Sequence, residues 1–166
     1  MKSSLRMRSI IVLLMTLTLF DLAYSHENQL PAKTKSSSSD ETERALKLHQ
    51  INEAYKKSVK PIFQKSCFDC HSQQTRYPWY YKIPGAKGLI NSDIAEAKKH
   101  IDFTNDFPFR GHGSPEEDIE AIRKTVNENT MPPFRYKVLH PSAGLNKAER
   151  ETILQWIKES LGELSK

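Results

Sequence analysis

The feature that most constrains this chain is the stretch SCFDCHS, which holds both of its cysteines. Two residues separate Cys67 from Cys70, and His71 follows directly. Such a spacing occurs in four kinds of structure: a disulfide, half of a zinc site, a redox-active dithiol and a covalent haem attachment. The choice among them decides what the rest of the chain has to fold around.

Three of these interpretations agree poorly with the rest of the sequence. A disulfide would close a very small loop, stabilise little and leave His71 unexplained. A thioredoxin-type dithiol needs a strand followed by a helix, and the chain offers only helices. Zinc needs two more ligands, but the chain has no second C-x-x-C, and its other histidines show no H-x-x-x-H spacing. These histidines are His26, His49, His100, His112 and His140.

The fourth interpretation uses all three residues, because C-x-x-C-H is the signature of c-type haem attachment. Thiols three positions apart can reach the two vinyl groups on one edge of a porphyrin, and the next imidazole then projects under the iron. We therefore expect one covalent haem c, with thioethers from Cys67 and Cys70 and with His71 as the proximal iron ligand. Zinc binding and thiol chemistry stay as alternatives.

Met131, in the sequence NTMPPFRY, is the expected distal iron ligand. It is the only methionine beyond residue 25 and lies 60 residues after His71. Pro132 keeps Met131 out of helical geometry and stiffens the loop, which lowers the cost of holding a weak thioether ligand. The alternative is that Met131 only fills space in the core, as most methionines do.

Three histidines compete with Met131 for the distal position. His100 lies late in a predicted helix and ranks first among them. His112 lies in a loop flanked by glycines, and His140 fits better as a loop residue that hydrogen-bonds to the backbone.

The N-terminus has the pattern of a secretory signal peptide. A basic start precedes the apolar run Ser9–Phe20, which is too short for a comfortable membrane span, and small residues at Ala23 and Ser25 favour cleavage after Ser25. We therefore expect residues 1–25 to be a signal peptide and the mature protein to be periplasmic. The alternative is an uncleaved membrane anchor, and only then would the chain contact a membrane.

Residues 26–42 contain a serine run and almost no apolar residues, so we expect a flexible linker. The folded domain is then 43–166. Removal of residues 1–25 would lower the formal net charge from +5 to about +3. The basic residues are interspersed with acidic ones, and nucleic acid is therefore not expected as a partner.

Hydrophobic periodicity predicts four helices, no strand and hence an all-α domain. The first runs from about Glu41 to Lys65, with a kink or restart at Pro61. The second runs from about Ser92 to Phe103. Capping boxes at Ser114 and Asn146 begin the third and fourth. The apolar residues expected on their buried faces are Leu48, Ile51, Tyr55, Val59, Ile62, Ile94, Ala97, Ile101, Ile119, Ile122, Val126, Ile153, Ile157, Leu161 and Leu164.

Two long irregular stretches, TRYPWYYKIPGAKG and TMPPFRYKVLHPSAG, are predicted between these helices. Loops of that length in a small domain usually surround a ligand, so we expect them to close on the haem. The side chains expected to wall it are Tyr77, Trp79, Tyr80, Tyr81, Phe134 and Tyr136. The cations available for its propionates are Arg76, Lys82 and Arg135.

Three separated blocks also resemble a known family. VKPIFQKSCFDCHS, YPWYYKIP and MPPFRYKVLHPSAGLNKAERETILQWI together resemble the bacterial haem-binding domain family of cytochrome c type, over about residues 55–160. The resemblance implies a small cytochrome c-like helical domain wrapped around one covalent haem at Cys67, Cys70 and His71, and it supports Met131 as the distal ligand. The family pattern includes a histidine early in the helix after the aromatic loop, whereas here the only histidine of that region is His100.

The expected function is single-electron transfer by a monohaem c-type cytochrome, with a separate redox protein as partner. Ligation by His71 and Met131 would close the iron to substrates and raise its reduction potential. A second hypothesis is a peroxidase-like haem enzyme or a gas or redox sensor with an open or displaceable distal site, in which His100 or His112 would act as the acid–base group. A third is an interaction module stabilised by zinc or by its thiols.

Overall fold

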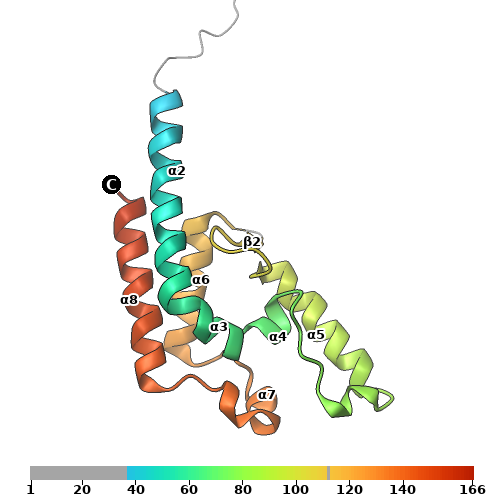
Figure 1. Cartoon of the computed structure of the whole chain (residues 1–166). Coiled ribbons are helices and arrows are strands. Elements are labelled where there is room, and N and C mark those ends of the chain that lie inside the picture. The colour runs from blue at the N-terminus through green and yellow to red at the C-terminus, as the bar shows by residue number, and fades with distance from the viewer. Residues whose placement is uncertain (1–36, 112) are drawn as a thin grey trace, which may run out of the picture. The chain divides into compact units, whose positions relative to one another are not determined.

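The all-α class is confirmed: the regular structure is helical except for one short antiparallel strand pair (Figure 1). This computed structural model describes residues 37–111 and 113–166. The predicted signal peptide, the linker up to residue 36 and His112 lie outside the described residues. In chain order the elements are α2 (Ser37–Ala54), the π-helical η1 (Tyr55–Val59), α3 (Lys60–Ser66), α4 (Phe68–His71), the 3-10 helix η2 (Trp79–Lys82), α5 (Ala86–His100), β1 (Ile101–Asp102), β2 (Arg110–Gly111), α6 (Pro115–Glu128), α7 (Phe134–Leu139), the 3-10 helix η3 (Pro141–Ala143) and α8 (Lys147–Leu164).

Within the described ranges, no helix combines the length and the apolar character that crossing a membrane requires.

The first predicted helix is present, and its interruption near Pro61 has a visible form. α2, η1 and α3 follow one another without a break, and the five residues before α3 are π-helical. Pro61 has no N–H group to donate and falls in the first turn of α3, where the missing donor costs least. Ile51, Tyr55 and Val59 are buried, as predicted.

The second predicted helix begins earlier and ends earlier than expected. α5 starts at Ala86 rather than at Ser92, because Gly85 adopts φ +87° and turns the chain directly into a helix. The helix ends at His100, where Ile101 and Asp102 pair antiparallel with Gly111 and Arg110. The prediction that the chain contains no strand was therefore wrong, because this one short strand pair is present.

Both predicted capping boxes are confirmed. The Ser114 hydroxyl accepts a hydrogen bond from the N–H of Glu117, and the Glu117 carboxylate accepts one from the N–H of Ser114. Asn146 and Glu149 form the same reciprocal pair at the start of α8. These local contacts satisfy helix N–H groups that would otherwise lack partners.

The two predicted irregular stretches contain short helices. Pro78 precedes η2, Pro133 precedes α7, and Pro141 is the first residue of η3. Proline is favoured at the start of a helix because its φ is already helical. Only η3 has its proline inside the helix, whereas Pro78 and Pro133 are the extended residues directly before η2 and α7.

The hydrophobic core lies between the N-terminal helices (α2, η1 and α3) on one side and α6 and α8 on the other. The connection from α5 to α6 also contributes to it. Phe103, Phe107 and Phe109 of that connection are buried, and the rings of Phe107 and Phe109 contact Trp156; none of the three was predicted to be buried. The buried cluster comprises Ile51, Tyr55, Val59, Phe63, Phe68, Ile101, Phe103, Phe107, Phe109, Ile119, Ile122, Val126, Ile153, Trp156 and Ile157.

Two sets of packed helices meet at the cysteine motif. α6 packs against α8, and α8 packs against η1. α4 packs against α5, which in turn packs against η2. Figure 1 shows α2, α6 and α8 together, with α5 apart from them and with α3 and α4 between. The motif therefore lies where the buried core ends.

Lys65, two residues before the first cysteine, joins α3 to the start of α8. Its Nζ lies 2.6 Å from both carboxylate oxygens of Glu149 and 3.1 Å from the carbonyl oxygen of Gly144. Burial would raise the pKa of Glu149, but the hydrogen bonds from Lys65 and from the N–H of Asn146 outweigh burial and lower this pKa. The contact fixes the end of α3 relative to the loop that leads into α8.

Replacing Glu149 by glutamine is expected to lower the free energy of unfolding by about 1 kcal/mol at neutral pH, because the charge pair and half of the capping box weaken together. The folded-state pKa of Glu149 lies below its unfolded value. Its contribution is therefore complete above the unfolded pKa and is lost as the pH falls through the folded pKa. In urea unfolding experiments, the free energy of unfolding should fall less between pH 7 and pH 3 in Glu149→Gln than in the wild type.

Glu151→Gln is the matched control, since Glu151 lies 3.9 Å from Lys147 and both side chains are well exposed. Surface pairs of this kind contribute little to stability. A Glu149→Gln chain as stable as Glu151→Gln at pH 7 would contradict the assignment.

Candidate functional site

The cysteine motif forms one separate helical turn. α3 ends at Ser66, Cys67 leaves helical geometry with φ −123°, and α4 begins at Phe68. The N–H groups of Cys70 and His71 both donate to the carbonyl oxygen of Cys67, at 3.2 and 3.0 Å. Residues three and four positions apart on such a turn lie on the same side. Cys67, Cys70 and His71 are therefore brought together, as the motif predicts.

Both cysteines are free thiols in the structure. Cys67 packs against the hydrophobic core, and burial raises the pKa of its thiol to about 12. Burial likewise raises the pKa of Cys70. A reactive dithiol or a zinc thiolate needs the pKa lowered instead. In the described parts of the chain, no group of three or more His, Cys, Asp or Glu side chains is placed to hold a metal ion, so zinc has no further ligands there.

His71 is held in an orientation that suits an iron ligand. Its Nδ1 lies 2.9 Å from the carbonyl oxygen of Ile101, and because that oxygen can only accept, Nδ1 carries the proton and donates. The lone pair of the neutral ring is then on Nε2. Burial lowers the pKa of His71, which favours this neutral form. The carbonyl oxygen of His71 also accepts from the N–H of Phe103 at 2.7 Å.

The strand β1 thus supplies the group that orients His71. Sequence analysis missed this role because it assigned Ile101, from its apolar side chain, to the buried face of a helix. The partner of a ligating histidine fixes the tautomer and raises the basicity of the ring. Ile101 acts here through its backbone, a contribution that side-chain patterns do not reveal.

Asp69, between the two cysteines, is a second residue that sequence analysis missed. Its Oδ1 accepts from the backbone N–H of Arg76 at 2.9 Å and from Arg76 Nε at 3.2 Å. Its Oδ2 accepts from the Tyr136 hydroxyl at 2.8 Å and lies 3.4 Å from Arg76 Nη2. Burial, followed by the hydrogen bond to Asp69, raises the pKa of Tyr136, so the hydroxyl remains a donor. One carboxylate therefore joins α4 to both predicted loops.

The predicted distal residues lie in different surroundings. Met131 lies between α6 and α7 with 40% of its surface exposed. His100 is largely exposed at the end of α5, where its ring lies 3.4 Å from Glu96. His140 hydrogen-bonds to the backbone carbonyl of Tyr136 at 3.2 Å, as expected for a loop residue. His112 lies outside the described residues.

Two of the cations considered for the propionates are already paired. Arg76 contacts Asp69 and also donates to the carbonyl oxygen of Gln64 at 3.1 Å. Arg135 Nη2 lies 2.7 Å from Asp93 Oδ1 on α5. Both arginines therefore hold segments of the site together in this structure.

Large apolar side chains are exposed on the two predicted loops and their short helices. Trp79 is 81% exposed and Phe134 79% exposed, although both were expected to wall a ligand. Apart from Leu46, the exposed large apolar residues of the described chain all come from the ranges 77–89 and 131–139. They are Tyr77, Trp79, Ile83, Leu89, Met131, Phe134, Val138 and Leu139. Such an accumulation of exposed apolar side chains is typical of a surface that a ligand or partner covers.

A small pocket of about 60 Å³ borders the motif and is lined by Cys70, Tyr80, Ile94 and Tyr136 among others. Ligand pockets usually measure about 300–1,000 Å³. The pocket is therefore smaller than a typical ligand pocket. The donor set, two thiols and an imidazole on one turn, is the set that c-type haem attachment uses. The apolar side chains that would cover the group lie open on the adjacent segments.

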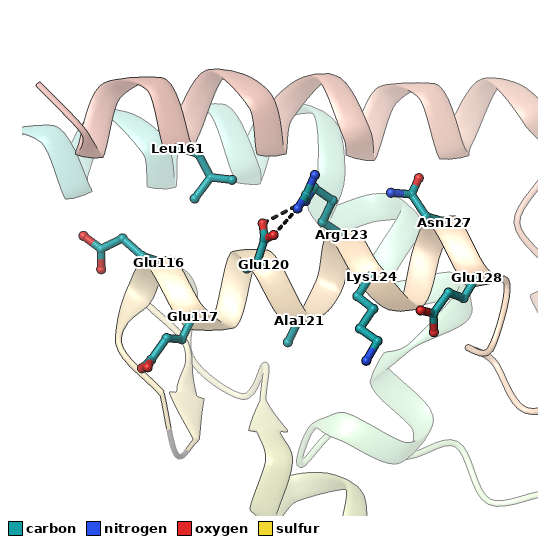
Figure 2. Close-up of a pocket in the computed structure, with 9 residues that line it drawn as sticks. All are labelled: Glu116, Glu117, Glu120, Ala121, Arg123, Lys124, Asn127, Glu128 and Leu161. Atoms are coloured by element: carbon teal, nitrogen blue, oxygen red, sulfur yellow. Dashed lines mark hydrogen bonds and ion pairs between the residues drawn. The ribbon is translucent and has the colours of Figure 1, made fainter.

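A second hollow lies along α6 beside Leu161 of α8 (Figure 2). It measures about 700 Å³ and is lined mainly by charged side chains. Figure 2 shows Glu120 and Arg123 paired with each other across one turn of α6. It shares no lining residue with the pocket at the motif, and no cysteine or histidine lines it.

Comparison with known proteins agrees with the donor set at the motif. Residues 20–159 match the sequence model of a family described as a haem-binding domain. A curated relative, cytochrome c peroxidase Ccp of Escherichia coli (strain K12), is 32% identical over 102 residues. The match covers 60% of this chain but only 22% of that relative. No solved structure matches the chain.

Proposed function

Because the chain belongs to the haem-binding domain family, we propose that it is an exported monohaem c-type cytochrome that carries single electrons. Cys67 and Cys70 would hold the haem through thioethers, His71 would be the proximal iron ligand and Met131 the distal one. The bound group would supply a one-electron ferric–ferrous couple. The protein would provide the attachment, the two ligands and the apolar cover.

The observation that carries this proposal is the geometry of α4. Two free thiols and an imidazole share one turn, burial favours the neutral imidazole, and its Nδ1 lies against the carbonyl oxygen of Ile101, so Nε2 would be the atom that binds iron. A thioether at the other axial position would give the Met/His ligation that raises the potential in electron-carrying cytochromes. Met131 follows α6 directly and is the only methionine in the described residues.

The proposal also includes export to the periplasm, where a separate redox protein would exchange electrons with this chain. Its support is the N-terminal sequence, in which a basic start, the apolar run Ser9–Phe20 and small residues at Ala23 and Ser25 form a signal-peptide pattern. A covalently attached haem suits an exported protein, because the cofactor cannot be lost by dissociation.

A peroxidase-like enzyme or a sensor is the second candidate, and two observations favour it. The curated relative carries the name cytochrome c peroxidase. Met131 is 40% exposed, so a distal ligand at this position would be open to displacement. In this case the distal side of the iron would admit peroxide or a small gas.

Redox titration together with peroxide consumption separates the two candidates. An electron carrier is expected to take up one electron per chain, reversibly, and to consume hydrogen peroxide no faster than free haem does. Peroxide consumption well above that level, with a reduced donor protein present, would overturn the carrier in favour of the enzyme.

A further inference from the structure

α7 is attached to the domain by polar contacts rather than by burial. None of its six residues is buried, and Phe134, Val138 and Leu139 are largely exposed. Hydrophobic packing therefore does little to fix its position. Two contacts between side chains connect α7 to the rest of the site, Arg135 with Asp93 and Tyr136 with Asp69, and Lys137 Nζ also lies 3.5 Å from the carbonyl oxygen of Asn129.

The Tyr136–Asp69 contact is the better protected of the two. The Asp69 side chain is only 16% exposed, whereas Arg135 and Asp93 are 64% and 37% exposed. Exposed ion pairs contribute little, because solvent screens them. A hydrogen bond to a sheltered carboxylate is among the stronger polar contacts in proteins. Asp69 is also oriented by the backbone N–H and Nε of Arg76, which keeps its Oδ2 directed at the Tyr136 hydroxyl.

Met131 lies five residues before Tyr136, and Pro132 and Pro133 occupy the positions between Met131 and α7. Two successive prolines limit the backbone freedom of this connection. A constraint on Tyr136 is therefore transmitted to Met131. Asp69 lies on the same helical turn as Cys67, Cys70 and His71.

We propose that Asp69 and Tyr136 are positioning residues, and that their hydrogen bond holds the Met131 segment over the haem-attachment turn and so keeps the distal side of the iron closed. This inference rests on the proposed function, in which Met131 is the distal ligand. The inference gives a role to Asp69, which lies between the two cysteines. The attachment chemistry does not itself require this residue.

Tyr136→Phe tests the inference, because it removes the hydroxyl and keeps the ring that stacks on His140 at 4.2 Å. Ferrous haem-loaded protein is titrated with carbon monoxide, and the far-red band of thioether-ligated ferric iron is recorded. We expect half-saturation at a carbon monoxide concentration about tenfold lower than in the wild type, and a weaker far-red band.

Thr152→Val is the control. It removes a hydroxyl that donates within α8, to the carbonyl oxygen of Ala148 at 2.9 Å, in a helix that contributes no residue to the proposed haem site. The control is expected to behave as the wild type. In a Met131→Leu background, Tyr136→Phe is expected to have no further effect on carbon monoxide binding, because it acts through Met131.

Two failures can be told apart. Wild-type protein that binds carbon monoxide as readily as Met131→Leu would overturn both the distal assignment and this inference. A closed wild type that opens in Met131→Leu but is unchanged in Tyr136→Phe would overturn this inference alone. An equal change in Tyr136→Phe and Thr152→Val would also overturn it, since the effect would not depend on Asp69.

Discussion

A chain in which Cys67 and Cys70 are both replaced by alanine is expected to lose haem staining completely on a denaturing gel. The wild type, matured in a periplasm with haem-ligation machinery, should keep the stain, because thioether bonds survive denaturation. The two thiols are the only cysteines of the chain, so no other side chain can replace them. Alanine is chosen because it leaves no unpaired polar group where Cys67 packs against the core.

Gln73→Ala serves as the control for this experiment. Gln73 is exposed and lies just beyond the motif, and its contact with Thr104 uses the backbone N–H, which the substitution keeps. Its haem stain should equal that of the wild type. Stain that persists in the double alanine variant would contradict attachment through the two thiols.

Replacing Met131 by leucine is expected to open the iron. The substitution removes the sulfur and keeps the apolar volume, so the loop retains its packing. Ferrous protein should then bind carbon monoxide stoichiometrically, and the reduction potential should fall by on the order of 0.1 V, within the range of about 0.8 V over which axial ligands set haem potentials. Carbon monoxide difference spectra and a redox titration measure the two effects.

Leu46→Ala is the control, because Leu46 is an exposed apolar residue of α2, outside the two ranges that surround the site. It should change neither quantity. If Met131→Leu also leaves both unchanged, Met131 is not the distal ligand, and His100 becomes the next residue to test.

Local signals in the sequence predicted the helix starts at Ser114 and Asn146, because a capping box requires only residues three positions apart. The start of α5 was misplaced because Gly85 and Gly88 resemble a loop, and the positive φ of Gly85 is a property of the folded backbone. Phe103, Phe107 and Phe109, between α5 and α6, were not predicted to be buried, since their successive steps of four and two residues do not continue one helical or strand period.

At the site, too, local sequence signals predicted some features and missed others. The approach of Cys67, Cys70 and His71 follows from their spacing on one turn. The group that orients His71 is 30 residues away, in the backbone of Ile101, and Tyr136 meets Asp69 across 67 residues. Such contacts form only when the tertiary structure brings distant residues together. No local motif in a single sequence indicates them. The exposure of Trp79 and Phe134 likewise depends on how the loops are placed.

The visible spectrum of the mature protein tests the central claim most directly. It should be recorded oxidised, reduced, and reduced under carbon monoxide. We expect a low-spin spectrum of haem c, from haem that denaturation does not release, and we expect carbon monoxide to change it only at concentrations well above those that saturate Met131→Leu. A spectrum without haem, or a ferrous spectrum that carbon monoxide shifts at once, would contradict a closed electron-carrying site built from His71 and Met131.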